Sequence, residues 1–168
     1  MIGIAGIPSP VGPLTLAARG PRVCLLSFGS DDEAARRRLA RCYPGEPIEP
    51  QDDPAGAVTA LAAYFAGQLG ALDGIGVELT GTAFQRQVWE ALRRIPAGRT
   101  ASYAEIARAI QAPAAVRAVG AANGANPVAV IVPCHRVIGS NGTLTGYGGG
   151  LERKRWLLEH EGGVKGLW

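Results

Sequence analysis

Residues 82–124 read TAFQRQVWEALRRIPAGRTASYAEIARAIQAPAAVRAVGAANG, and this segment predicts a helical second half of the chain. Its first helix begins at a capping box formed by Thr82 and Gln85 and ends at the Pro-Ala-Gly of residues 96–98. Apolar side chains recur along one face of this helix at helical spacing, namely Phe84, Val88, Leu92 and Ile95. The pattern predicts an amphipathic helix that packs on a core.

Two shorter helices follow in the same stretch. Ser102 and Glu105 form a second capping box, which opens a helix that the Gln-Ala-Pro of residues 111–113 breaks. A third helix is expected over residues 114–124. Two short helices joined by a tight turn predict a helix-turn-helix.

The third helix has a face without bulky side chains. Val116 and Val119 are expected to pack inward, and the opposite face carries one arginine among small residues: Arg117, Gly120, Ala121 and Gly124. Such a face permits close approach to a DNA minor groove or backbone, with the arginine as its probe. A small-residue helix that packs against its own protein fits the same pattern.

The first half of the chain reads as a sheet followed by helices. Short β-like runs at residues 2–7, 14–18 and 23–28, separated by Pro- and Gly-rich turns, predict an antiparallel meander. Helices are expected over residues 34–42 and, after Pro54, to about residue 69. A glycine-rich linker over residues 70–81, with at most a short strand at residues 77–79, predicts two domains, residues 1–78 and 79–168.

Charge is divided unevenly between the two halves. The whole chain of 168 residues has a formal net charge of +3. Residues 1–81 hold 6 basic and 9 acidic side chains, whereas residues 82–168 hold 11 basic and 5 acidic ones. The excess of positive charge in the second half favours a polyanion as its partner, and a solvated surface with uneven charge is the alternative.

Cysteine usage and hydropathy predict a cytoplasmic protein. The three cysteines, Cys24, Cys42 and Cys134, are too few and too scattered for a secreted disulfide framework, and no signal peptide is recognised. No apolar run approaches the roughly 18 residues that span a bilayer, so a membrane protein is not expected.

Residues 126–136, Asn-Pro-Val-Ala-Val-Ile-Val-Pro-Cys-His-Arg, combine an apolar, strand-like run with a thiol, an imidazole and a guanidinium. A free thiol is only about 3% ionised at pH 7, so a nucleophilic Cys134 needs a base or positive charge nearby. His135 or Arg136 could meet this need. Neighbours on an extended strand point to opposite faces, so contact between Cys134 and His135 requires a turn or a bridging water.

These residues resemble one known family. Residues 133–139 (PCHRVIG), preceded by Asn126-Pro127 and followed by residues 145–151 (TGYGGGL), resemble the methylated-DNA–protein-cysteine methyltransferases, the O6-alkylguanine-DNA alkyltransferases. The resemblance extends to Ser102-Tyr103, to residues 117–120 (RAVG) and to residues 157–162 (LLEHEG). It implies an α+β protein with an N-terminal ribonuclease-H-like domain and a C-terminal, mainly helical, winged-helix-like domain.

The resemblance also implies an activity, which is irreversible, single-turnover transfer of an alkyl group from O6 of guanine, and less readily O4 of thymine, to the protein itself. Cys134 would be the acceptor. His135 would draw its proton through a water, Glu161 would orient the imidazole, and Asn126 would brace the turn that holds the thiol. Tyr103 would donate a hydrogen bond or proton to guanine N3 and lie near the phosphate of the flipped nucleotide.

DNA handling follows from the same resemblance. Arg117 would fill the space left by the flipped base, while Gly120, Ala121 and Gly124 let their helix enter the minor groove of double-stranded DNA that contains alkylated guanine. The substrate pocket would be formed by Val137, Tyr147 and Gly148, the last standing where the family often has serine. The protein would act as a monomer, without a cofactor.

A structural zinc, which some relatives bind, is not expected, because the first domain has Cys24 and Cys42 but no histidine. Both cysteines are expected to be structural. Three other functions stay open from the residues: a non-transferring sensor of alkylguanine, a transcriptional regulator and a cysteine hydrolase. The sensor lacks the acceptor cysteine that is present here, the regulator needs further domains, and the hydrolase would turn over repeatedly.

Overall fold

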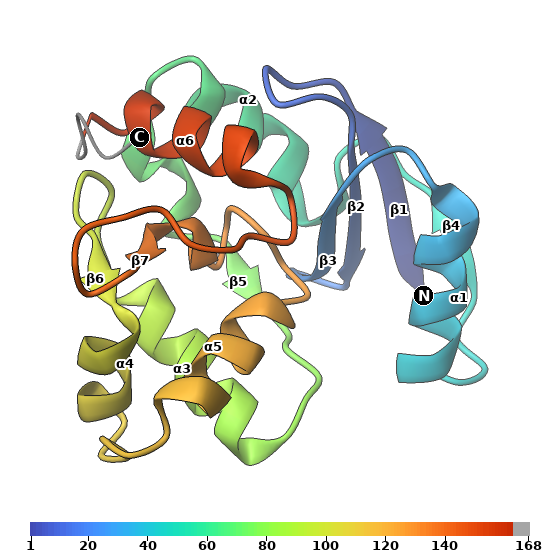
Figure 1. The fold of residues 1–168 in the computed structure, drawn as a ribbon. Helices are drawn as coiled ribbons and strands as arrows, with labels where there is room; N and C mark the ends of the chain where they lie inside the picture. Colours follow the sequence, from blue (N-terminus) through green and yellow to red (C-terminus); the bar gives the residue numbers. More distant parts are fainter. Residues whose placement is uncertain (163–168) are drawn as a thin grey trace. The chain divides into compact units, whose positions relative to one another are not determined.

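The computed structural model describes residues 1–162 and divides them into two compact units (Figure 1). The first unit comprises residues 1–80 together with residues 127–131. The second comprises residues 81–126 and continues from residue 132. The chain therefore returns to the first unit for five residues, 127–131, just before Cys134. A single boundary between residues 78 and 79 does not describe this return. The family resemblance predicted an α+β fold, and that prediction is confirmed.

A five-stranded sheet of order β4-β1-β2-β3-β5 forms the first unit. The predicted meander is present as β1 (Ile2–Ile7), β2 (Leu14–Arg19) and β3 (Arg22–Phe28), which pair antiparallel. Two short strands that pair in parallel extend its edges, β4 (Ile48–Pro50) beside β1 and β5 (Gly76–Val77) beside β3. β4 was not predicted, because three residues are too few to show an alternating pattern.

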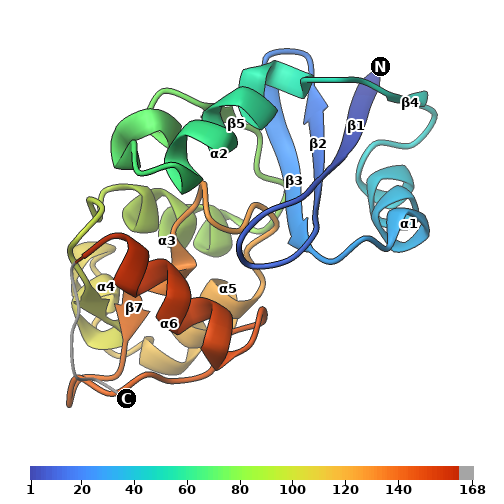
Figure 2. The ribbon, with the colours of Figure 1, turned by 90° about the horizontal axis from the view of Figure 1, so that it is seen from above.

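Helices cover both faces of this sheet. α1 (Asp32–Cys42) is capped by the side chain of Asp31, while α2 (Ala57–Phe65) is flanked by the 3₁₀ turns η1 (Pro54–Gly56) and η2 (Leu69–Leu72). Figure 2 shows α1 and α2 on opposite sides of β1, β2 and β3. The helix predicted after Pro54 to about residue 69 is therefore shorter than expected. It begins after Gly56, which has a left-handed φ of 69°, and ends at Phe65, before Gly67 with a φ of 110°.

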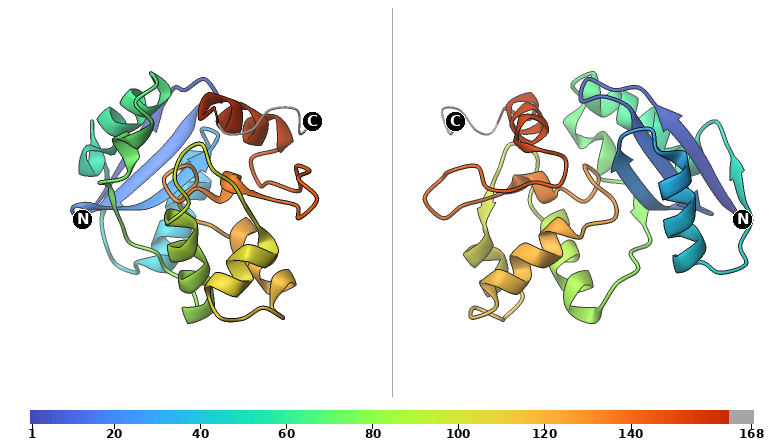
Figure 3. Two further views of the ribbon diagram at one scale, coloured as in Figure 1. Left: turned by 90° about the vertical axis from the view of Figure 1, so that its left-hand side faces the viewer. Right: turned by 45° about the vertical axis from the view of Figure 1, so that its right-hand side comes forward.

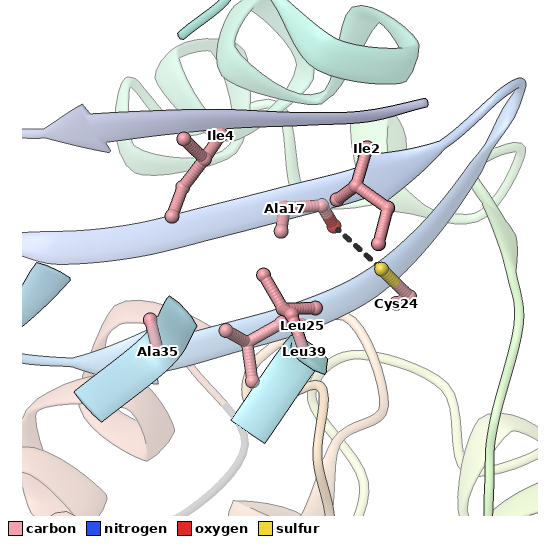
Figure 4. Packing of buried hydrophobic residues seen from close by; sticks show 7 residues of the cluster. All are labelled: Ile2, Ile4, Ala17, Cys24, Leu25, Ala35 and Leu39. Carbon is pink, nitrogen blue, oxygen red and sulfur yellow. Dashed lines mark hydrogen bonds between the residues drawn. The ribbon is translucent and has the colours of Figure 1, made fainter. Parts of the chain in front are cut away.

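The core on the α1 side is made of small and branched apolar residues (Figure 4). Ile2 and Ile4 of β1 point toward Leu25 of β3 and toward Ala35 and Leu39 of α1. Strand β3 carries a β-bulge here, because its register against β2 skips one residue, and that extra residue is Cys24. The Cys24 thiol lies 3.6 Å from the carbonyl of Ala17, so this cysteine is a packed part of the sheet.

The second unit is mainly helical. It contains α3 (Ala83–Arg93), α4 (Tyr103–Ala109), α5 (Val116–Gly124) and α6 (Leu151–His160). Figure 3 shows α3, α4 and α5 packed together, and the indole nitrogen of the buried Trp89 on α3 donates to the carbonyl of Ala122 on α5 at 2.8 Å. The capping box of Thr82 and Gln85 is formed in both directions, as predicted.

Two short strands bring distant residues of the second unit together. β6 (Ala101–Ser102) immediately precedes Tyr103, and β7 (Val137–Ile138) immediately follows a 3₁₀ turn, η3 (Cys134–Arg136). β6 and β7 pair in parallel, with Ala101 opposite Val137. The pairing places the start of α4 beside the cysteine turn.

The apolar run before Cys134 is not a strand, contrary to the prediction. Val128 makes one isolated parallel bridge to Leu26, and turns follow up to Pro133. Val130 has a φ of 68°, a left-handed conformation that is strained for a β-branched residue by about 1–3 kcal/mol. The run is apolar because it is buried, and burial alone does not require an extended backbone. No helix within residues 1–162 is both long and apolar enough to cross a membrane.

Candidate active site

Cys134 opens the η3 turn and is only 6% exposed. Two asparagine side chains hold the backbone around it. The side-chain nitrogen of Asn126 donates to the carbonyl of Val132 at 2.8 Å, and that of Asn123 on α5 donates to the carbonyl of Cys134 itself at 3.4 Å. Both asparagines thus contact the backbone of the cysteine turn, and nothing in the sequence marks the contact of Asn123.

His135 and Glu161 form a buried hydrogen-bonded pair. Nε2 of His135 lies 2.9 Å from Oε2 of Glu161, and neither side chain is exposed by more than 1%. Because the carboxylate can only accept, Nε2 carries the proton and Nδ1 is the basic nitrogen. Nδ1 is buried and has no hydrogen-bond partner in the part of the chain that the structure describes. The basic nitrogen of the pair, Nδ1, thus belongs to the residue that directly follows the thiol of Cys134 in the sequence.

Burial and charge set the protonation of these groups. Burial raises the pKa of the Cys134 thiol, although hydrogen bonds with Asn126 and Tyr147 and the charge of Lys154 act in the opposite direction. Burial lowers the pKa of His135 below its usual value of 6.5, against the effect of Glu161. Burial disfavours ionised Glu161, but hydrogen bonds from His135 and Arg136 outweigh it and hold the pKa of this carboxyl below its usual range. At neutral pH the resting site therefore contains a thiol, a neutral imidazole and a carboxylate.

Arg136 is a further member of the site, with a role beyond the positive charge that its place beside Cys134 suggests. Its side chain is turned toward Glu161, with Nε 2.9 Å from Oε1 and Nη2 2.9 Å from Oε2. Nη1 also donates to the carbonyl of Ile95 at 2.6 Å. The sequence could not show this pairing, because Arg136 and Glu161 are separated by 25 positions.

Lys154 is a buried cation of α6 that no motif in the sequence marks. It is fully buried, and its ammonium donates to the carbonyl of Thr145 at 3.1 Å. No carboxylate pairs with it within residues 1–162. Burial lowers the pKa of Lys154 to about 8. A signal was available, since Lys154 precedes Leu157 and Leu158 by three and four residues and so belongs to the buried face of the helix.

Tyr103 is the first residue of α4 and is half-buried. Its hydroxyl lies 2.9 Å from the side-chain hydroxyl of Thr145, in the loop between β7 and α6. A Cβ added at Gly120 would lie 3.9 Å from the Tyr103 ring, so the tyrosine also lies against α5. The fold therefore brings Tyr103 and α5 together.

The small-residue face of α5 is partly as predicted. Arg117, Ala121 and Gly124 are exposed, Gly120 is half-buried beside Tyr103, and Val119 is fully buried. The expectation that Val116 packs inward is wrong, because its side chain is 37% exposed. Val116 is the first residue of the helix, which begins two positions later than predicted, so the helix has no preceding turn there to cover it.

The three predicted pocket residues lie on β7 and on the loop that follows it. Val137 is buried and Tyr147 is half-buried. Gly148 is exposed, and a Cβ built on it would meet nothing within 4 Å. A side chain at position 148 would therefore fit, so the glycine is not required by packing.

The cysteines of the first unit are embedded in its structure. Burial raises the pKa of Cys24 to about 11, which makes it a poor nucleophile at neutral pH. Cys42 accepts a hydrogen bond from the hydroxyl of Thr80 at 3.6 Å. Among residues 1–162, no three His, Cys, Asp or Glu side chains are grouped so that they could hold a metal ion.

The fold and this site define a two-unit α+β protein in which a cysteine lies beside a histidine–carboxylate pair, an arrangement suited to nucleophilic chemistry. Two domain families match nearly the whole chain. They are the 6-O-methylguanine DNA methyltransferase ribonuclease-like domain over residues 5–79 and the DNA binding domain of the same proteins over residues 83–163. The chain belongs to the 6-O-methylguanine DNA methyltransferase family, which confirms the resemblance seen in the sequence.

Curated relatives and solved structures agree with this assignment. The chain is 52% identical over 164 residues to the methylated-DNA–protein-cysteine methyltransferase of Mycobacterium tuberculosis, covering 96% of this chain and 93% of the relative. It is 54% identical over 159 residues to that of Shigella flexneri, covering 93% of both chains. A crystal structure of the M. tuberculosis O6-methylguanine methyltransferase superposes with a TM-score of 0.80 at 49% identity, over 96% of this chain and 93% of the other. The prediction of a methyltransferase of this class is thereby confirmed.

Proposed function

We propose that this chain repairs double-stranded DNA by moving an alkyl group from O6 of guanine, and less readily from O4 of thymine, onto the sulfur of its own Cys134. The transfer is irreversible and occurs once per molecule. The observation that carries the proposal is the buried His135–Glu161 pair, whose basic Nδ1 belongs to the residue next to the thiol. A structure of the M. tuberculosis relative in complex with DNA, similar with a TM-score of 0.78 at 48% identity, supports DNA as the partner.

The thiol is activated by proton transfer. Neutral His135 takes the proton of Cys134 at Nδ1 through a water, and the imidazolium is stabilised by the carboxylate of Glu161, 2.9 Å from Nε2. Because burial raises the pKa of the thiol, the thiolate forms only when this base and the nearby positive charge of Lys154 support it. The reactive form is therefore generated inside the site and is not exposed to bulk solvent.

The transfer itself is a displacement at carbon. The sulfur of Cys134 forms a bond to the alkyl carbon while the bond from that carbon to O6 breaks, and the electron pair stays on the guanine. Tyr103 donates a hydrogen bond at N3 as this negative charge develops, and the guanine regains one proton. The net change moves one alkyl group and one proton, so no cofactor is needed.

DNA binding and base flipping involve α5. Its exposed Arg117 fills the space that the flipped nucleotide leaves, and Gly120, Ala121 and Gly124 let the helix approach the minor groove closely. The backbone carbonyl of Val137 accepts from the guanine amine, and Tyr147 forms a wall of the pocket. At position 148, where relatives often have a serine, the backbone N–H of Gly148 donates the hydrogen bond to O6. The missing side chain leaves more room for bulky alkyl groups.

Intact-mass measurement tests the proposal. The purified protein is mixed with excess duplex DNA containing O6-methylguanine, digested and mapped. We expect a gain of about 14 Da, the mass of one added CH₂, confined to Cys134 and saturating at one equivalent. Cys134→Ala should bind the same duplex and gain no mass, whereas Cys24→Ala and Cys42→Ala should react like the unchanged protein.

Each other outcome contradicts the proposal in a distinct way. Modification at Cys24 or Cys42 would remove Cys134 as the acceptor. Binding of the lesion without modification would indicate a sensor of alkylguanine, and multiple turnovers would indicate a cysteine hydrolase.

A further inference from the structure

Thr145 connects the DNA-facing tyrosine to a buried lysine. Its side-chain hydroxyl lies 2.9 Å from the hydroxyl of Tyr103, and its carbonyl accepts from the ammonium of Lys154 at 3.1 Å. The three residues come from three segments, the start of α4, the loop before α6 and α6 itself. The Tyr103 contact bridges 42 positions of sequence, so it exists only in the folded protein.

The hydrogen bond from the Lys154 ammonium holds the backbone of Thr145 in place. Lys154 is fully buried and has no carboxylate partner within residues 1–162, so the Thr145 carbonyl is the acceptor that the structure gives this ammonium. Hydrogen bonds to a charged donor are about twice as strong as neutral ones. The bond uses backbone of Thr145, which leaves its hydroxyl available for Tyr103.

The direction of the hydroxyl–hydroxyl bond decides what it can do. Tyr103 has a single hydrogen, and it can donate that hydrogen to a base only if Thr145 donates to the tyrosine oxygen. A donor on the tyrosine oxygen polarises the phenol and strengthens the hydrogen bond that the phenol donates onward. The same donor stabilises negative charge that reaches the phenol oxygen when the guanine leaves.

We propose that Thr145 is a positioning residue for Tyr103: its hydroxyl holds the tyrosine oxygen, and Lys154 holds Thr145. The inference rests on the proposed function, because it concerns the hydrogen bond that Tyr103 gives to the departing guanine. Thr145 also lies two positions before Tyr147, so the anchored carbonyl fixes the loop that carries this pocket residue.

Matched variants separate the hydroxyl from the shape of the side chain. Thr145→Val keeps the shape and the backbone carbonyl but removes the hydroxyl, and Thr145→Ser keeps the hydroxyl. Thr143→Val is the control in the same loop, because the Thr143 hydroxyl bonds only to Asn141 in the described structure, at 2.6 Å. All are compared with Tyr103→Phe and with the double variant, as full-length proteins with cooperative thermal unfolding.

The readout is the single-turnover rate of methyl transfer to Cys134, followed by intact mass, with DNA affinity measured in parallel. We expect Thr145→Val to slow transfer about 3- to 10-fold, the range of one net hydrogen bond, without weakening DNA binding. Thr145→Ser should restore most of the rate, and Thr143→Val should match the unchanged protein. The double variant should be no slower than Tyr103→Phe, because the threonine acts through the tyrosine.

Two results overturn the inference. One is a rate for Thr145→Val equal to that of the unchanged protein, and the other is a double variant whose loss is the product of the two single losses. Failure of the proposed function looks different, because the unchanged protein would then acquire no methyl group on Cys134.

Discussion

The guanidinium of Arg136 donates two hydrogen bonds to the carboxylate of Glu161, from Nε to Oε1 and from Nη2 to Oε2, both at 2.9 Å. The same carboxylate accepts from His135, and Glu161 is the C-terminal cap of α6. A bidentate pair fixes the plane of the carboxylate, which one hydrogen bond cannot do. Arg136 therefore orients the carboxylate of Glu161, and this carboxylate in turn orients the imidazole of His135.

Replacing this arginine by lysine should weaken both the fold and the reaction. Arg136→Lys keeps the charge but cannot make the two parallel bonds or reach the Ile95 carbonyl at the same time. We expect the free energy of unfolding to fall by about 3 kcal/mol and transfer to slow by about tenfold or more. Urea unfolding and single-turnover rates measure this, with the exposed Arg155→Lys as control. Equal behaviour of the two variants would argue against the orienting role.

Removing the exposed arginine of α5 should affect duplex DNA selectively. Arg117→Ala should slow transfer from O6-methylguanine in a duplex by about 10- to 100-fold. Flipping costs a few kcal/mol, and without Arg117 no side chain occupies the space that the flipped nucleotide leaves. Transfer from free O6-benzylguanine requires no flipping and should be unchanged within about twofold. Rates on the two substrates are compared directly. Similar losses on both would place Arg117 in the chemistry and not in flipping.

The rate of transfer should stay high when the pH falls below 6.5, the ordinary pKa of histidine. The base must be neutral to accept the proton, and burial lowers the pKa of His135 below 6.5, so the acid limb of the rate profile should lie below pH 6.5. Rates with free O6-benzylguanine between pH 5 and 8 test this. The unfolded chain takes up a proton at this histidine near pH 6.5 and the folded one does not, so stability also falls below that pH. Unfolding is therefore monitored over the same range, and a limb centred above pH 6.5 would contradict the assignment.

Removing the buried ammonium should stabilise the protein. Lys154→Met should raise the free energy of unfolding at pH 7 by about 1–3 kcal/mol, because a pKa lowered from 10.5 to about 8 reflects a cost of burying the charged form. In the unchanged protein that cost is relieved as pH rises from about 8 to 10.5, where the unfolded chain holds more protons than the folded one. Stability should therefore increase over this interval in the unchanged protein and less so in the variant. Urea unfolding at pH 7 and pH 10 gives both differences, and a variant less stable at pH 7 would show that the Thr145 contact outweighs burial.

Much of the local structure could be predicted from short-range patterns. The Thr82–Gln85 capping box and the meander of β1, β2 and β3 depend on neighbours within a few residues or on alternation along a strand, and both are present. The family motif around Cys134 led to the acceptor that we propose and to its neighbours in the sequence. Patterns failed where burial comes from distant segments, as in the turns around Val130 and the exposed Val116.

The groups that the protein has are readable from its residues: a cysteine followed by a histidine and an arginine, capped helices in a basic second half, and a small-residue helix with one arginine. Which of these groups meet is visible only in the folded chain. The pairing of β6 with β7 brings Tyr103 beside the cysteine turn, and the fold brings Arg136 and Glu161 together across 25 positions. Such contacts depend on the geometry of the whole second unit, because hydrogen bonds and charge pairs act over a few ångströms in space, whatever the separation along the chain.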